Sequence, residues 1–202
     1  MQEIGRITLL QVQKSKLVIE DLHQVYDYYD PTPLLVVESL QLSPEGVIGI
    51  TADGGKVMDV HHMHHPHSCN IKGSNGVSLG FTSHYASMRK AFGEHLVDGV
   101  AGENIIVAAD AILTLADLGK RLVIQTQSAG QSVYLTRLKV ATPCIEFSQF
   151  AANAGMPMPA QQLKATLQFL NEGRRGFYAI VAASNDDTTI RVGDRVLADD
   201  ND

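Results

Sequence analysis

The sequence is poor in cysteine, has no long apolar run and carries no excess of basic residues. Its two cysteines, Cys69 and Cys144, are too few for the disulfide framework of a small secreted domain. No uninterrupted run of about 18 apolar residues occurs, so we expect no membrane-spanning helix. The 16 Lys and Arg against 22 Asp and Glu give a net charge of −6. This charge argues against the basic surface of a general nucleic-acid-binding protein.

Other missing features narrow the class of protein further. The first residues, MQEIGRITLLQV, suggest a strand and lack the basic start, apolar core and cleavage site of a signal peptide. No Gly-x-Ser-x-Gly elbow is present, which disfavours a serine hydrolase. No lysine stands in a recognisable Schiff-base context, so no pyridoxal phosphate is expected. These absences favour a cytoplasmic, reducing setting in which both thiols are free.

What the sequence does contain is a series of about ten short β-rich segments separated by Gly, Pro and Asp turns. Helical patterns are fewer and occupy Ser83–Phe92, Ile145–Ala154 and Ala160–Glu172. Strands and helices do not alternate regularly, which disfavours a doubly wound sheet. We therefore predict a mainly β fold, a closed or partly open β-barrel with two or three short peripheral helices.

The hydrophobic pattern of Ser132–Val140 supports a barrel. Val133 and Leu135 are apolar at odd positions, whereas Leu138 and Val140 are apolar at even ones. A strand whose apolar phase changes midway is either buried on both faces or bent by a bulge, as barrel strands often are.

The C-terminal segment is predicted to contain a last pair of strands followed by an acidic tail. Thr188–Val192 and Arg195–Ala198 are predicted to form a hairpin around Gly193-Asp194. No repeat or linker divides the sequence, so residues 1–198 are predicted to form one domain. Residues 199–202 form an acidic tail that we expect to be disordered.

Cys144 is the first candidate for chemistry. Pro143 ends the preceding strand-like segment, and Cys144 stands immediately before the helical pattern of Ile145–Ala154. Amide N–H groups at a helix N-terminus can stabilise a thiolate, as a sulfur nucleophile or a soft metal ligand requires. The alternative is a small buried cysteine that acts as a hydrophobic side chain.

The segment HHMHHPHSC, from His61 to Cys69, is the second candidate. It holds five of the eight histidines of the chain, and imidazole is the commonest metal ligand in proteins. In an extended chain several ligands would share one side; they are His61, His65, His67 and Cys69. No second cluster completes a zinc pattern, and a solvated loop with local hydrogen bonds is the alternative.

Four short motifs together resemble a known family. They are Gly102-Glu103-Asn104-Ile105, Pro143-Cys144, Arg174-Arg175-Gly176-Phe177-Tyr178 and Ile190-Arg191-Val192-Gly193-Asp194. Their order and spacing are similar to those of the MOSC domain, the C-terminal domain of molybdenum-cofactor sulfurases, which also occurs as stand-alone bacterial proteins. The resemblance covers about residues 46–197, and it implies a β-rich barrel.

The resemblance implies that Cys144 is the functional cysteine of this family. Cys144 would then carry sulfur as a persulfide, or bind the molybdenum of a molybdopterin cofactor, and soft thiolate sulfur suits both roles. A molybdenum-dependent reductase of N-hydroxylated compounds is one form that such a protein takes in relatives. Whether this chain is an enzyme stays open at this point.

The same resemblance supplies the other candidate residues. Arg174 and Arg175 would pair with the pterin phosphate, or would be solvated cations at a helix end. The turn Gly102, Glu103 and Asn104 would shape the pocket or only hold its own backbone. Many members carry a Gly-Asp-x-x-His-like element where this sequence reads Met58-Asp59-Val60-His61-His62. Asp59 and His61 are therefore site candidates in a region that departs from the family.

Partners follow from the length of the chain. It is too short to contain the pyridoxal-phosphate desulfurase that sulfurases attach to this domain, so sulfur would come from another protein. A cysteine desulfurase or a molybdenum enzyme is the expected partner, and a homodimer is an open arrangement. Two alternatives remain: a metal-binding module built on the histidine segment, and a non-catalytic β-barrel that binds a partner through its loops.

Overall fold

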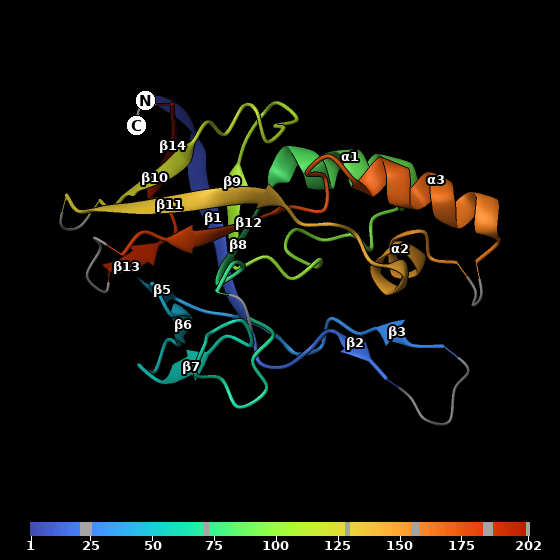
Figure 1. Cartoon of the computed structure of the whole chain (residues 1–202), viewed down its shortest axis with the longest axis horizontal. Helices are drawn as coiled ribbons and strands as arrows, with labels where there is room; N and C mark the ends of the chain where they lie inside the picture. Colours follow the sequence, from blue (N-terminus) through green and yellow to red (C-terminus); the bar gives the residue numbers. More distant parts are fainter. Residues whose placement is uncertain (21–25, 71–72, 128–129, 155–157, 184–187, 201–202) are drawn as a thin grey trace.

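The computed structural model describes residues 1–20, 26–70, 73–127, 130–154, 158–183 and 188–200. Within these residues seven strands pair side by side, and the pairing of the last with the first closes a barrel (Figure 1). In order around the barrel they are β14 (Arg195–Asp199), β10 (Arg121–Gln125), β11 (Ser132–Val140), β12 (Phe177–Val181), β8 (Val77–Phe81), β9 (Ile105–Ala108) and β1 (Gln2–Gln13). The predicted mainly β barrel is confirmed.

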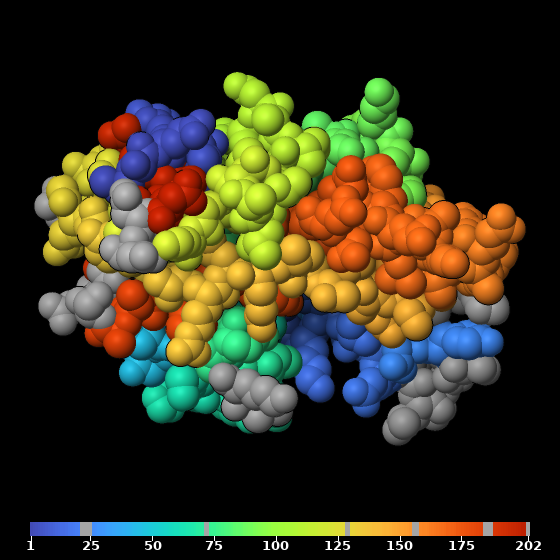
Figure 2. All heavy atoms as spheres, turned by 45° about the horizontal axis from the view of Figure 1, so that its top comes forward, coloured from blue at the N-terminus to red at the C-terminus, as the bar shows by residue number. Residues whose placement is uncertain are grey.

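Smaller elements surround this barrel. The short strand β4 (Leu34–Val36) pairs with the far end of β1, and a four-stranded sheet contains, in order, β13 (Thr188–Arg191), β5 (Ser39–Ser43), β6 (Gly46–Ile50) and β7 (Lys56–Met58). A two-stranded ribbon consists of β2 (Val18–Ile19) and β3 (Tyr28–Tyr29). The helices of the described chain are α1 (Thr82–Phe92), α2 (Ile145–Ala151) and α3 (Ala160–Leu170). They gather at the opposite end of the molecule from the two termini (Figures 1 and 2).

Two hydrophobic clusters hold these layers together. Aliphatic side chains from the strands fill the first cluster, among them Leu10, Leu40 and Leu135. The second cluster is richer in aromatic and long side chains, including Tyr85 and Phe147, and it joins the helices to the barrel. Burying one such side chain contributes about 1.5–3 kcal/mol of hydrophobic stabilisation. The segment that carries α2 is therefore anchored to the barrel by packing.

Strand β11 has the bend that its hydrophobic phase predicts. Its pairing with β12 shifts register between Thr136 and Lys139, and Arg137 between them has a φ of +52°. The extra residue moves the apolar side chains of the second half to the other face. Beyond the bend, β11 runs to Val140 and delivers the chain to α2.

The predicted C-terminal hairpin is wrong. Strand β13 pairs with β5, whereas β14 pairs with β1 and β10, so the two strands lie in different sheets. The turn at Gly193-Asp194 is real: Gly193 has a φ of +93°, and Asp194 accepts a hydrogen bond from the backbone N–H of Arg191 at 2.8 Å. Gly193 also donates its N–H to the carbonyl of Ile7. This contact to β1 turns the chain from one sheet into the other.

The acidic tail begins later than expected. Asp199 is the last residue of β14, only 2% exposed, and its carboxylate lies 2.6 Å from the guanidinium of Arg121. The charge that suggested a disordered tail is therefore paired in the fold, because a buried carboxylate needs a cation. Residues 201–202 lie outside the described residues.

Helix α1 starts at Thr82, directly after β8, one residue before the predicted start at Ser83. The Ser83 hydroxyl donates to the carbonyl of Ala111 at 2.7 Å, and no side chain caps the helix. Tyr85 and Met88 of this helix belong to the second cluster, and Phe92 packs against it. The other two helical patterns end earlier than predicted, at Ala151 and Leu170.

His84 of α1 is fully buried between two backbone partners. Its Nδ1–H donates to the carbonyl of Gly173 at 2.9 Å, and its Nε2 accepts from the N–H of Leu113 at 3.0 Å. Because one nitrogen must accept, the ring is neutral. Burial lowers the pKa of His84 to about 4, in spite of the hydrogen bond to the Gly173 carbonyl, which raises it.

Because the His84 imidazole is buried in its neutral form, we expect the free energy of unfolding to decrease in acid. Below about pH 6.5 the unfolded chain binds a proton at His84, whereas the folded chain does not bind it until about pH 4. The free energy of unfolding therefore decreases as the pH is lowered from about 6.5 to about 4. The contribution of His84 to the loss between pH 7 and pH 5 is about 2 kcal/mol. We expect urea denaturation to show a smaller loss over this interval for His84→Gln. Equal losses in both proteins would contradict this role.

Candidate functional site

Cys144 occupies the position that caps helix α2. Its Sγ accepts a hydrogen bond from the N–H of Phe147 at 3.4 Å. Its carbonyl accepts from the N–H of Ser148 at 3.1 Å and from the Ser148 hydroxyl at 2.7 Å. The sulfur is half-buried and free of any disulfide. The end of β11, Pro143 and the first turn of α2 therefore fix where this thiol points.

The ionisation of Cys144 differs from the expectation. Burial raises the pKa of the thiol, and this effect exceeds the lowering by the Phe147 N–H. Nearby Glu146 raises the pKa further, whereas Arg175 lowers it. The resting group at neutral pH is therefore a protonated thiol, not the thiolate that its position at a helix start suggested. A metal or a bound sulfur atom would have to displace this proton.

Cys144 opens into a cavity of about 190 Å³. The cavity brings together side chains from distant parts of the chain, which are Gln13, Lys16, Leu17, Val18, Tyr29, Val60, His61, Cys69, Cys144, Arg175 and Tyr178. Three of them, Cys144, Arg175 and His61, are candidates from the sequence. Cys69 is also present, although the sequence associated it only with the histidine segment. The Cys144 thiol therefore shares its cavity with a second cysteine and with two basic residues, Lys16 and Arg175.

Arg175 is a cation in this cavity whose charge acts on Cys144. Its guanidinium carbon lies 5.2 Å from the centre of the Phe147 ring, and Arg175 lines the cavity. Burial alone lowers the pKa of Arg175, but Tyr178 and Glu103 outweigh it and raise the pKa above its ordinary value. A charged guanidinium at the wall of a cavity can bind an anion through its N–H donors.

Arg174 does not share this position. Its guanidinium donates to the carbonyl of Phe169 at 2.9 Å and lies 4.9 Å from the centre of the Phe169 ring. Arg174 does not line the cavity. Of the two adjacent arginines, the structure places only Arg175 beside Cys144.

Glu103 lies behind the cavity wall. It is fully buried, and its Oε2 accepts a hydrogen bond from the Tyr85 hydroxyl at 2.6 Å. Burial raises the pKa of Glu103, whereas Arg175 and the Tyr85 hydrogen bond lower it. Its Oε1 is tightly enclosed, because a Cβ at either Gly80 or Gly176 would lie 2.9 Å from it. Glu103 therefore acts on the site through its electrostatic interaction with Arg175.

Asn104 and Asp59 form a buried network beneath His61. The Asn104 amide donates to Asp59 Oδ2 at 2.8 Å, and the N–H of Gln13 donates to the same oxygen at 2.7 Å. Asp59 Oδ1 accepts from the backbone N–H of His61 at 2.8 Å and pairs with its Nδ1 at 3.1 Å. Asp59 is fully buried. It orients His61 towards the cavity and does not line the cavity itself.

The Gly102 turn supports the same wall. Its carbonyl accepts from the Gln13 side-chain amide at 2.6 Å. Gly102 has a φ of +97°, and a Cβ there would lie 2.7 Å from both Gln13 Nε2 and Leu17 Cδ1. Since Gln13 and Leu17 line the cavity, glycine at this position allows the wall to close around it.

The histidine segment splits in the structure. His61 faces the cavity, whereas His65 and the exposed His67 remain on the loop, where His65 Nδ1 accepts from the N–H of His67 at 3.1 Å. Among the described residues, no three His, Cys, Asp or Glu side chains are placed to hold a metal ion. The local hydrogen bonds match the solvated-loop interpretation. The metal-binding module stays a prediction.

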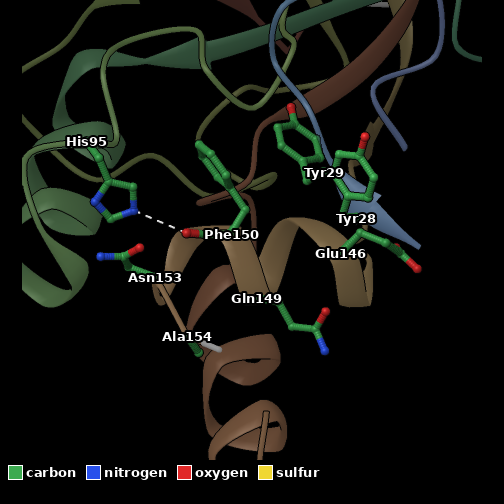
Figure 3. Close-up of a pocket in the computed structure, with 8 residues that line it drawn as sticks. All are labelled: Tyr28, Tyr29, His95, Glu146, Gln149, Phe150, Asn153 and Ala154. Carbon is green, nitrogen blue, oxygen red and sulfur yellow. Dashed lines mark hydrogen bonds between the residues drawn. The ribbon is translucent and has the colours of Figure 1, made fainter. Parts of the chain in front are cut away.

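A second, larger hollow of about 350 Å³ lies beside α2 (Figure 3). Tyr28, Tyr29 and Phe150 give it aromatic walls, and the Nε2–H of His95 donates to the carbonyl of Phe150 at 3.2 Å. Tyr29 also lines the cavity of Cys144. The described lining of the hollow beside α2 includes neither a cysteine nor an arginine. We therefore assign the candidate site to the smaller cavity.

The fold and site together define a β-barrel protein with a small cavity that is lined by two cysteines and an arginine. Residues 69–197 match the family model of the MOSC domain, which is more than half of the chain. The protein belongs to the MOSC domain family, which is associated with molybdenum-cofactor binding. The match begins at Cys69, later than residue 46, where the resemblance was expected to start.

Solved structures agree with this assignment at the level of the fold. The YuaD protein from Bacillus subtilis is 14% identical with a TM-score of 0.51, over 95% of this chain and 96% of its own. A structure described as a hypothetical protein is 12% identical with a TM-score of 0.52, over 96% of this chain and 66% of its own. No curated protein matches the sequence. None of the described helices has both the length and the apolar character needed to cross a membrane.

Proposed function

We propose that this protein carries sulfur for the molybdenum cofactor as a persulfide on Cys144. The observation that supports it most directly is that Cys144 and Arg175 line one small cavity, where the charge of Arg175 lowers the pKa of the Cys144 thiol. A persulfide adds one sulfur atom and ionises to an anion. The Phe147 N–H at 3.4 Å from Sγ and the charge of Arg175 would both stabilise that anion.

The transfer reaction needs no outside oxidant. Cys144 loses its proton and attacks the outer sulfur of a persulfide on a donor protein. A new S–S bond forms at Cys144, the S–S bond of the donor breaks, and the donor thiolate takes up a proton. The half-buried position of Cys144 limits side reactions of the product.

Mass spectrometry of the wild-type protein tests this proposal. After incubation with a cysteine desulfurase and cysteine, we expect the peptide that contains Cys144 to gain about 32 Da, the mass of one sulfur atom. A thiol reductant should remove the added mass. Absence of the adduct, in a protein whose Cys144 is still alkylated by iodoacetamide, would contradict the proposal.

A second candidate function is binding of the molybdenum cofactor itself, with Cys144 as a metal ligand. The donor set fits this group: a soft thiol for the metal, and Arg175 and Lys16 for an anionic substituent. The cavity, at about 190 Å³, is smaller than the usual small-molecule pocket of about 300–1,000 Å³. It would therefore enclose only part of the cofactor. When bound, the cofactor supplies redox chemistry, such as the reduction of N-hydroxylated compounds.

The two adjacent arginines provide a matched test of anion binding. We expect Arg175→Ala to lower the molybdenum content of protein purified from cofactor-producing cells about tenfold or more, since a charge-assisted hydrogen bond contributes about 1.5–3 kcal/mol. Arg174→Ala should keep the wild-type content, because Arg174 points to Phe169. Arg175→Lys should recover part of the loss. Equal losses for the Arg174 and Arg175 alanine variants would refute the role of Arg175.

A further inference from the structure

The cavity of Cys144 contains the only other cysteine of the chain. Cys69 lies in the loop after β7, 75 residues before Cys144 in the sequence. Both residues nevertheless line the same cavity of about 190 Å³. Neither is in a disulfide. A group bound in this cavity would lie next to both cysteines.

The loop that carries Cys69 is anchored in place. The N–H of Cys69 donates to the carbonyl of Val60 at 2.9 Å. Further along, Ser74 accepts a hydrogen bond from Lys139 of β11 at 2.9 Å, and Figure 2 shows the teal loop next to the yellow-orange chain that leads to α2. The position of Cys69 beside Cys144 therefore depends on contacts of the backbone and of neighbouring side chains.

The two sulfur atoms have different hydrogen-bond environments. Cys69 Sγ has a carbonyl acceptor, that of His67 at 3.8 Å, which favours a protonated thiol. Cys144 Sγ has an N–H donor, that of Phe147 at 3.4 Å, which favours an anion. A sulfur atom that ionises as a persulfide is therefore held better on Cys144 than on Cys69.

We propose that Cys69 is a second sulfur-carrying residue, which receives sulfur from a protein persulfide donor and passes it to Cys144 inside the cavity. This inference rests on the proposed function of Cys144 as a carrier. It assigns a role to a residue outside the family's single functional cysteine, and it explains why a loop that departs from the family pattern ends in a thiol at this wall.

The internal step balances without any further reactant. The thiolate of Cys144 attacks the outer sulfur of the Cys69 persulfide, and a bond forms between Cys144 Sγ and that sulfur. The bond from Cys69 Sγ to the same sulfur breaks. The proton released by Cys144 is taken up by the Cys69 thiolate, so one persulfide and one thiol give one persulfide and one thiol.

Two single variants test the relay with a cysteine desulfurase and cysteine as the sulfur source. In Cys144→Ser we expect the gain of about 32 Da to be trapped on Cys69, because the acceptor is missing. In Cys69→Ser we expect Cys144 to gain sulfur about tenfold more slowly than in the wild type. Both readouts come from mass spectrometry of the separated peptides.

Other outcomes separate the relay from the carrier function. If Cys144 gains sulfur at the wild-type rate in Cys69→Ser, and Cys69 stays unmodified in Cys144→Ser, the relay is refuted and the carrier function stands. If neither cysteine gains sulfur in the wild type, both proposals fail. Dibromobimane, which cross-links two neighbouring thiols, should join Cys69 to Cys144 in the wild type; lack of this cross-link, with both thiols alkylated singly, also refutes the relay.

Discussion

The Cys144→Ser variant is expected to retain no molybdenum above background and to carry no sulfane sulfur at position 144. Serine keeps the size and the hydrogen-bonding role of the side chain, but its hydroxyl forms no persulfide. The hydroxyl is also a hard ligand, whereas the proposed binding of molybdenum uses the soft sulfur of Cys144. Molybdenum analysis of purified protein and mass spectrometry of the Cys144 peptide measure the two losses.

This substitution should leave the fold unchanged. Cys144 caps α2, and serine is among the preferred residues at such a position, so thermal unfolding should occur at the wild-type temperature or above it. Cys69→Ser is the matched control for metal content, because Cys69 is proposed to move sulfur and not to bind the metal. Full molybdenum content in Cys144→Ser would show that the cofactor binds without this thiol.

The barrel could be predicted because its signals are local. Turn residues divide the sequence into short strands, and the phase change between Leu135 and Leu138 marks the bulge that bends β11. The position of Cys144 at a helix start could also be predicted from neighbouring residues, because Pro143 precedes it and a helical pattern follows it. The pairing of strands could not be predicted in this way, because the partner of a strand can lie far away in the sequence. Thr188–Arg191 was assigned to a terminal hairpin, although it pairs with β5, which lies far away in the sequence.

The candidate site could be predicted only in part, for the same reason. Arg174 and Arg175 are indistinguishable in sequence, and the backbone between α3 and β12 decides that only Arg175 reaches the cavity. Cys69 and Cys144 line one cavity only because the fold brings together segments that lie far apart in the sequence. The ionisation of Cys144 was misjudged because burial, which raises its pKa, cannot be read from a helix start.

Asp59→Ala is expected to cause the largest loss of stability among the variants considered. The Asp59 carboxylate accepts from the N–H of Gln13, the N–H of His61 and the Asn104 amide, all within 2.8 Å. Asp59 is fully buried, so alanine would leave these donors without partners and away from water. The expected loss in the free energy of unfolding is about 3–5 kcal/mol.

Urea denaturation followed by far-ultraviolet circular dichroism measures this loss, because the chain has no tryptophan for fluorescence. Asp53→Ala is the matched control: Asp53 also accepts hydrogen bonds, from Thr51 and Gly55, but on an exposed turn where water can replace it. We expect a much smaller loss there. Asp59→Asn, which keeps the shape and one acceptor, should fall between the two. If Asp59→Ala were as stable as Asp53→Ala, the network that orients His61 would not stabilise the fold.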